Sequence, residues 1–152
     1  MATTDDHTID HPLRQAVPFV RTLGLEFLEA SAERAVLRLP DVPEQRNHIG
    51  GPHAGAMWTL AEAASGTITL EAFGHRLGDL LPLPVHSEIQ FLKPAMGRIT
   101  ATAVLGRPAD EVIAESDGGT RPEFPVKIDL TTEDGTVTGR MSITWTLKRV
   151  RA

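Results

Sequence analysis

Residues 47–62 bring a glycine-rich loop and a single carboxylate into close succession. The loop contains Gly50-Gly51, continues through His53-Ala54-Gly55 and leads into a helical pattern in which Glu62 is the first acid. Where a loop enters a helix, the first backbone N–H groups lack intrahelical acceptors and lie at the positive end of the helix dipole. Such a terminus can bind an anion or stabilise the oxyanion that develops during acyl transfer. The segment therefore predicts a helix-terminus site that carries one acid.

Glu62 stands on a helical segment that is otherwise nearly uncharged. A helical wheel places it away from the apolar stripe that contains Met57 and Leu60. It groups instead with Trp58, Thr59, Ser65, Gly66 and Thr69. A carboxylate in such surroundings needs a partner, or its pKa is raised. The alternative is that Glu62 is solvated or satisfied by a basic neighbour, and that Asn47 and His53 serve only the loop and the helix cap.

The elements that position this segment are one long helix and a series of strands. Residues 53–73 form the longest helical pattern, and many of them are Gly, Ala or Ser. Because Gly inside a helix costs about 1 kcal/mol relative to Ala, this composition favours a helix that other elements approach closely. A shorter helical pattern at 12–23 is interrupted by Pro18, which allows two short pieces. Strand patterns cover residues 25–30, 34–39, 85–93, 98–105, 125–132 and 137–147, with a short helix at 108–115.

The last strand pattern is the clearest. Apolar and polar residues alternate from Val137 to Leu147, which is typical of a strand with one buried face. The turn Glu133-Asp134-Gly135 before it predicts a hairpin with the preceding strand. Together these elements predict one α+β domain over residues 1–152, a long central helix wrapped by an antiparallel sheet, with a flexible start at 1–11. The open edges of such a sheet need cover, which favours a homo-oligomer.

Composition excludes several classes of chemistry. The chain of 152 residues is 41% hydrophobic, contains no cysteine and has a formal net charge of −5. Disulfides, thiolate nucleophiles and cysteine-ligated zinc are therefore excluded, and no concentration of positive charge favours nucleic acid or an anionic membrane. The first twelve residues lack the basic and apolar regions of a signal peptide. No apolar run reaches the roughly 18 residues of a membrane span, so we expect a cytoplasmic protein.

The spacing of the loop and helix residues resembles the signature of the hotdog thioesterases, in particular the phenylacetate-pathway and 4-hydroxybenzoyl-CoA types and related uncharacterised hotdog families. In that signature Asn and Gly precede a His-Gly-Gly at the start of the central helix, and Asp or Glu follows nine residues after the His. Asn47, Gly50, His53 and Glu62 keep this spacing. The run at 88–95, followed by Gly97, resembles the family's third strand and its turn. The resemblance implies the hotdog fold and an acyl-CoA or other acyl-thioester hydrolase.

The catalytic roles follow from the resemblance residue by residue. Glu62 would attack the thioester carbonyl or activate water, and the backbone N–H of Ala54, helped by Gly55, would polarise that carbonyl. One departure is that this chain has His53-Ala54-Gly55 where the family has His-Gly-Gly. The backbone amide survives a change from Gly to Ala, so the oxyanion role persists if φ at Ala54 stays negative.

The resemblance also implies how substrate is bound. Residues predicted to bind substrate are Asn47, Gly50, His53, Trp58 and Ser65. Family members pair so that each site lies at a subunit interface, which implies a homodimer or a dimer of dimers. No cofactor and no metal are expected. Basic residues available for the phosphates of a CoA ester are Lys93, Arg98, Arg107, Lys127 and Arg140, each of which also fits an ordinary surface charge.

Two other functions stay open. His48 and Glu62, fourteen residues apart, have the spacing of the acid–base pair in hydroxyacyl-thioester dehydratases, although the segment at 48–52 lacks the first Pro of their His-Phe-Pro-Gly motif. Alternatively the pocket binds an acyl thioester without hydrolysing it, because a fold does not fix a function. A metal site has little support, since His7 and His11 lie in the expected flexible start. Residues 106–122 are expected to be a surface decoration.

Overall fold

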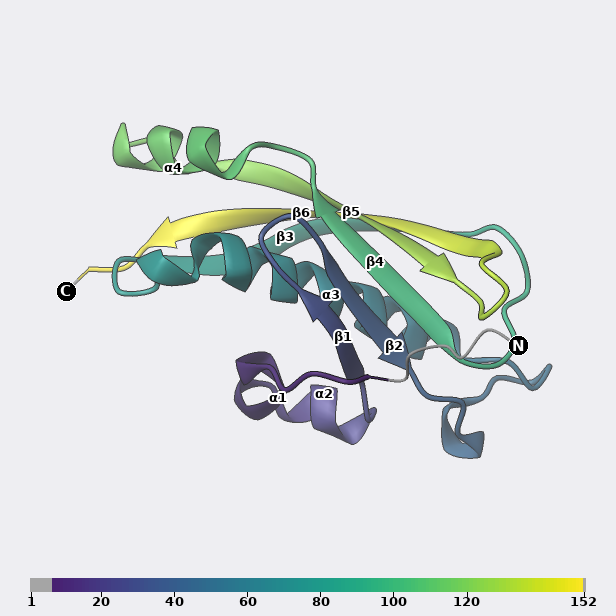
Figure 1. The fold of residues 1–152 in the computed structure, drawn as a ribbon. Helices are drawn as coiled ribbons and strands as arrows, with labels where there is room; N and C mark the ends of the chain where they lie inside the picture. The colour runs from purple at the N-terminus through teal and green to yellow at the C-terminus, as the bar shows by residue number, and fades with distance from the viewer. Residues whose placement is uncertain (1–6, 152) are drawn as a thin grey trace.

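The computed structural model describes residues 7–151, and its central feature is one antiparallel sheet laid along a long helix (Figure 1). The six strands are β1 (Glu26–Ala30), β2 (Ala35–Leu39), β3 (Leu80–Phe91), β4 (Ile99–Leu105), β5 (Glu123–Thr131) and β6 (Val137–Arg149). Their order across the sheet is β1-β2-β4-β5-β6-β3, and every pairing is antiparallel. The predicted α+β architecture is confirmed, including the hairpin of β5 and β6.

The helices lie on both sides of this sheet. The long helix α3 (Ala54–Phe73) runs along its inner face, and the short helices α1 (Pro12–Ala16) and α2 (Pro18–Thr22) lie beside that face (Figure 1). Helix α4 (Ala109–Asp117) lies on the opposite side. Two 3-10 turns, η1 (Pro43–Gln45) and η2 (Gly74–Arg76), flank the ends of the α3 segment. The predicted break at Pro18 is present, because Val17 adopts an extended conformation between α1 and α2.

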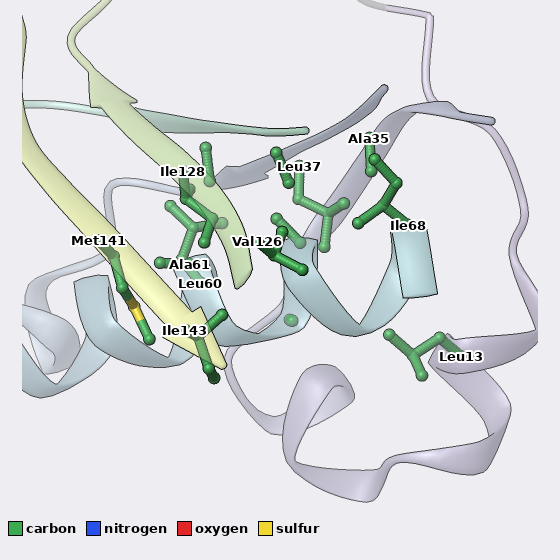
Figure 2. Close-up of a cluster of buried hydrophobic side chains, with 14 of the residues drawn as sticks. Leu13, Ala35, Leu37, Leu60, Ala61, Ile68, Val126, Ile128, Met141 and Ile143 are labelled. Atoms are coloured by element: carbon green, nitrogen blue, oxygen red, sulfur yellow. The ribbon is translucent and has the colours of Figure 1, made fainter. Parts of the chain in front are cut away.

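Helix α3 is buried on nearly every face, as its small residues predict. Of its 20 residues, 14 are buried. Figure 2 shows Leu60 and Ala61 of α3 among core side chains from β5 and β6, namely Val126, Ile128, Met141 and Ile143. Further along β6, Trp145 and Leu147 continue the same buried face. The predicted alternation holds from Arg140 to Trp145, whereas Thr146 of the predicted polar face is buried, because its hydroxyl donates to the carbonyl of Pro122 in the segment before β5. Ala, Gly and Ser along α3 allow the sheet and the N-terminal helices to approach its backbone closely.

The outer strand β3 differs most from its prediction. It begins at Leu80, five residues before the predicted start at 85, and it contains Pro82 and Pro84. Proline cannot donate a ladder hydrogen bond, so it reads as a strand breaker in sequence but is tolerated on an edge strand. β3 is such an edge, and Leu81, Val85 and Phe91 on it are 45–51% exposed.

The start of the described chain is held in place. Ile9 forms a backbone bridge with Phe27, and the buried ring of His11 stacks on Phe27 with 5.1 Å between centroids. His11 Nδ1 accepts the N–H of Leu13, so Nε2 carries the proton that is donated to Glu71 Oε1 at 2.9 Å. The predicted flexible start therefore does not extend to His11, and the prediction of a mobile surface histidine there was wrong. Residues 1–6 of that start lie outside the described residues.

The segment between β4 and β5 forms α4 and is anchored at the C-terminal end of α3. Val112 is fully buried, and Arg76 of η2 donates to Asp117 at 2.9 Å.

No helix within residues 7–151 is long and apolar enough to cross a membrane. The same residues contain no group of three or more potential metal ligands.

Candidate active site

The loop before α3 is organised by one side chain. Asn47 Oδ1 accepts the backbone N–H groups of Ile49 at 3.0 Å and of Gly51 at 3.1 Å. Its Nδ2 donates to the carbonyl of Pro52 at 3.3 Å. These three bonds give Asn47 the loop role that was the alternative in the sequence, and its predicted contact with substrate stays a prediction.

The two loop glycines are needed for different reasons. Gly50 has φ of +83°, a conformation that L side chains rarely adopt. Gly51 lies so close to the segment after β3 that an added Cβ would be 2.1 Å from the carbonyl oxygen of Ala95. The loop therefore packs closely against Ala95 and Met96. The predicted contact of Gly50 with substrate stays a prediction.

At the start of α3, His53 is the N-cap. It accepts the hydrogen bond of one of the two backbone N–H groups that were predicted to bind the oxyanion. Its Nδ1 accepts the N–H of Gly55 at 2.9 Å, and the ring is otherwise exposed. The N–H of Ala54 has no acceptor among residues 7–151, and none of these residues other than glycine has a positive φ. The geometry at Ala54 is thus helical, and its amide is free to bind a ligand oxygen.

Glu62 lies two turns further along α3 and is half-buried. No hydrogen bond or ion pair joins its carboxylate to another residue in the described part of the chain. Burial disfavours the charged form and raises the pKa of Glu62 above its usual value. An unpartnered, desolvated carboxylate is the state expected of a group that acts on a substrate rather than on the fold.

The neighbours of Glu62 on its helix face reach two strands. Trp58 Nε1 donates to Ser87 Oγ on β3 at 3.3 Å. Ser65 is fully buried, accepts the Nε1–H of Trp145 at 3.0 Å and donates to the carbonyl of Glu62 at 2.6 Å. The sequence placed Trp145 on a buried strand face but gave no register that could bring it to Ser65. Nothing in the sequence singled out Ser87.

A groove of about 290 Å³ lies at the N-terminal end of α3. Its walls are Asn47, Ile49, Pro52, Ala54 and Met57 on one side and Phe91, Leu92, Lys93, Pro94 and Ala95 on the other. The groove thus unites two of the predicted site residues, whereas the other six lie outside it. Phe91 is 51% exposed and lines this groove.

The remaining candidates are dispersed. His48, the base of the dehydratase alternative, is exposed on the loop and makes no hydrogen bond within residues 7–151. Among the basic residues considered for CoA phosphates, Lys93 lines the groove. Arg107, Lys127 and Arg140 are bonded to Glu115, Ser142 and Asp129, and none of the three basic residues lines the groove.

Comparison with known proteins places this geometry in a family. Residues 7–147 match the family described as a domain of unknown function, DUF4442, and no curated protein matches the sequence. The Pseudomonas aeruginosa protein PA5026, described as a probable thioesterase of unknown function, shares 26% identity with a TM-score of 0.81, over 92% of this chain and 93% of that chain.

Two further solved structures extend the likeness. A thioesterase family protein from Silicibacter pomeroyi shares 21% identity with a TM-score of 0.73, over 91% of this chain and 95% of that one. A mutant of the phenylacetic acid degradation protein PaaI from Thermus thermophilus shares 17% identity with a TM-score of 0.68, over 86% and 98%. The predicted resemblance and the predicted fold are confirmed: the chain belongs to the DUF4442 family and has the hotdog fold of thioesterase-family proteins.

Proposed function

We propose that this protein hydrolyses acyl thioesters, with acyl-CoA or a similar thioester as substrate and Glu62 as the catalytic carboxylate. The observation that carries the proposal is the state of Glu62, which is half-buried, without a partner among residues 7–151, and raised in pKa by burial. A base with a raised pKa holds a proton more readily during the reaction than an exposed carboxylate does. The thioesterase-family neighbours support the same chemistry.

In the proposed reaction the thioester carbonyl oxygen binds the free N–H of Ala54. Negative charge that develops on this oxygen is stabilised by the amide and by the positive end of the α3 dipole. Glu62 either takes a proton from water as the water oxygen adds to the carbonyl carbon, or attacks that carbon itself to form an anhydride that water then opens. In both routes the C–S bond breaks, the thiolate takes up a proton, and the products are a carboxylic acid and a thiol.

The oxyanion donor at Ala54 and the carboxylate of Glu62 are too far apart on one helix to act on the same carbonyl group. Ala54 and Glu62 are eight residues apart, which is about 12 Å along an α-helix. The oxyanion donor and the attacking group must each lie about 3 Å from the same carbonyl. We therefore propose that each site combines Ala54 of one protomer with Glu62 of its partner. The exposed apolar residues on the edge strand β3, Leu81, Val85 and Phe91, support a paired assembly.

The groove beside Ala54 fits the remainder of such a substrate. Met57, Phe91 and Leu92 give it an apolar wall, and Lys93 adds one positive charge. A thioester whose carbonyl is bound to Ala54 would lay a flexible, mainly apolar arm against that wall. The acyl group itself would extend toward the side of the site that the partner protomer completes.

The first test is thiol release from a panel of acyl-CoA esters by wild type, Glu62→Gln and Glu71→Gln. Glu71 is the other acid of α3 and serves as the matched control, because a Gln there can still accept the hydrogen bond of His11. Hydrolysis should fall about a hundredfold or more in Glu62→Gln and stay near wild type in Glu71→Gln. If wild type releases no thiol from any ester but still binds one, the protein is an acyl-thioester binder and the proposal is wrong.

The second test asks whether two chains build one site. Ala54→Pro removes only an N–H, because proline is tolerated at the first position of a helix and His53 already has φ of −64° and ψ of 142°. Each of Glu62→Gln and Ala54→Pro should be nearly inactive alone. In a refolded equimolar mixture, half of the dimers are mixed and one of their two sites is intact, so about a quarter of wild-type activity should return. A mixture that stays inactive would place both groups of each site in the same chain.

A further inference from the structure

The turn of α3 that carries Glu62 is tied to strand β6 by two buried polar side chains. Trp145, on the inner face of β6, donates its Nε1–H to Ser65 Oγ at 3.0 Å. Ser65 donates its own proton to the backbone carbonyl of Glu62 at 2.6 Å. Ser65 is fully buried and Trp145 is 7% exposed, so water does not compete for either bond. The chain of bonds therefore runs from β6 directly to the backbone of Glu62.

The other hydroxyl groups of α3 do not form such a link. Thr59, Thr67 and Thr69 donate to the carbonyls of Gly55, Ala63 and Ser65 within the same helix, at 2.7–2.9 Å. Among the described residues, no side chain outside the helix donates to these three hydroxyls. Ser65 thus differs from them in receiving a hydrogen bond from the sheet.

This turn also contains the residue that most weakens it. Gly66 follows Ser65 and lies inside the helix, where Gly costs about 1 kcal/mol relative to Ala and leaves the backbone least restrained. A Cβ at position 66 would lie 3.8 Å from the ring of Trp145, an ordinary contact, so the packing there does not require a glycine. The indole of Trp145 thus packs beside Gly66 and also forms the hydrogen bond to Ser65 that restrains this turn.

We propose that Ser65 and Trp145 are positioning residues, which fix the backbone at Glu62 and thereby the direction in which its carboxylate leaves the helix. The inference rests on the proposed role of Glu62 in thioester hydrolysis. A displacement of about 1 Å in a catalytic group can cost a hundredfold in rate, so a tether of this kind affects turnover more than substrate binding. Ser65, predicted from sequence to contact substrate, would act in this proposal through Glu62 instead.

The test compares Ser65→Ala, Trp145→Phe and the double variant with Thr67→Val. Thr67→Val is the matched control, because it removes a buried α3 hydroxyl whose bond stays within the helix. Ser65→Ala and Trp145→Phe should each lower kcat about tenfold with KM within about twofold of wild type. The double variant should be little worse than either single variant, since both changes break one chain of bonds. Thr67→Val should keep wild-type kcat at a comparable loss of stability.

A second measurement does not depend on activity. NMR titration of the Glu62 side-chain carboxyl should show its pKa moving toward the usual value in Ser65→Ala and Trp145→Phe, as the loosened turn admits water, and unchanged in Thr67→Val. If wild type hydrolyses no thioester, the proposed function fails, and this titration alone decides the inference. An unchanged titration of Glu62 in both folded variants overturns it, as does full kcat in both, or an equal loss of kcat in Thr67→Val.

Discussion

Among the described residues, charged side chains are unpaired in the N-terminal half of α3 and paired beyond its C-terminal end. In its N-terminal half, Glu62 is half-buried, has no partner among residues 7–151, and has a pKa raised by burial. Beyond its C-terminal end, Arg76 donates to Asp79 at 2.7 Å and to Asp117 at 2.9 Å, and Arg149 lies nearby. Hydrogen bonds from Arg76 are the main cause that lowers the pKa of both aspartates.

This contrast separates a structural cluster from a candidate site. The charges around Arg76 are partly exposed and matched, and they join η2, α4 and the end of β6. The carboxylate of Glu62 receives no such compensation, although the backbone that carries it is held by Ser65. A protein that keeps a desolvated, unmatched acid in a restrained position loses stability there, which is typical of a functional group.

Substitutions of Gly51, before α3, and Gly74, after it, test the difference between the two ends with the largest expected effect. A Cβ at Gly51 would lie 2.1 Å from the carbonyl oxygen of Ala95, so Gly51→Ala must displace the loop that leads into α3. We expect a loss of about 2–3 kcal/mol in the free energy of unfolding and a loss of thioester hydrolysis. Urea denaturation and thiol release would measure the two effects.

Gly74, at the other end of the helix, is the matched control. It has φ of −58°, and a Cβ there would meet nothing within 4 Å. Gly74→Ala should therefore be neutral or stabilising by about 0.5 kcal/mol, with activity unchanged. Equal losses of stability in both variants would contradict the distinction between the two ends.

Glu62→Gln tests whether the charge of Glu62 is uncompensated, and we expect this variant to be more stable than wild type. A folded-state pKa above the unfolded value means that the folded protein binds the Glu62 proton more tightly, so this group favours folding in acid and opposes it once pH rises through the folded pKa. Removing the charge should raise the free energy of unfolding at neutral pH, on the order of 1 kcal/mol. The gain should shrink as pH falls through the raised pKa of the folded protein and vanish below the usual pKa of a glutamate. A variant less stable than wild type at pH 7 would show that Glu62 has a stabilising partner.

Most of the secondary structure could be predicted from local patterns in the sequence. Three features reflect rules that act over a few residues, and the structure follows them: the small residues of α3, the break at Pro18 and the alternation in the middle of β6. The spacing from Asn47 to Glu62 is also local, and it led to the thioesterase-family resemblance.

What the sequence could not supply depends on contacts between distant segments. The pair Ser65 and Trp145 is 80 residues apart, and the pair Trp58 and Ser87 is 29 apart. Which side chain meets which follows from strand register, and no local pattern fixes that register for β3 with its two prolines. The occupation of the Gly55 amide by His53 likewise depends on a side-chain rotamer.

A small loss of stability is expected at the C-terminal end, in Arg76→Gln. The aspartates that it pairs with have lowered pKa values, so their contribution to stability exists above the unfolded pKa of an aspartate and is lost as pH falls through the folded value. Because solvent reaches these charges, the fall in Tm should be small and should be largely lost near 1 M salt, where the Debye length is only about 3 Å. Arg140→Gln, which breaks a single exposed pair with Asp129 on the sheet, is the control and should lower Tm less. Thioester hydrolysis should be unchanged in both, since neither arginine is among the residues that line the groove at Ala54. A large loss of activity in Arg76→Gln would mean that the two ends of α3 are coupled, and that the charge matching at one end supports the unmatched acid at the other.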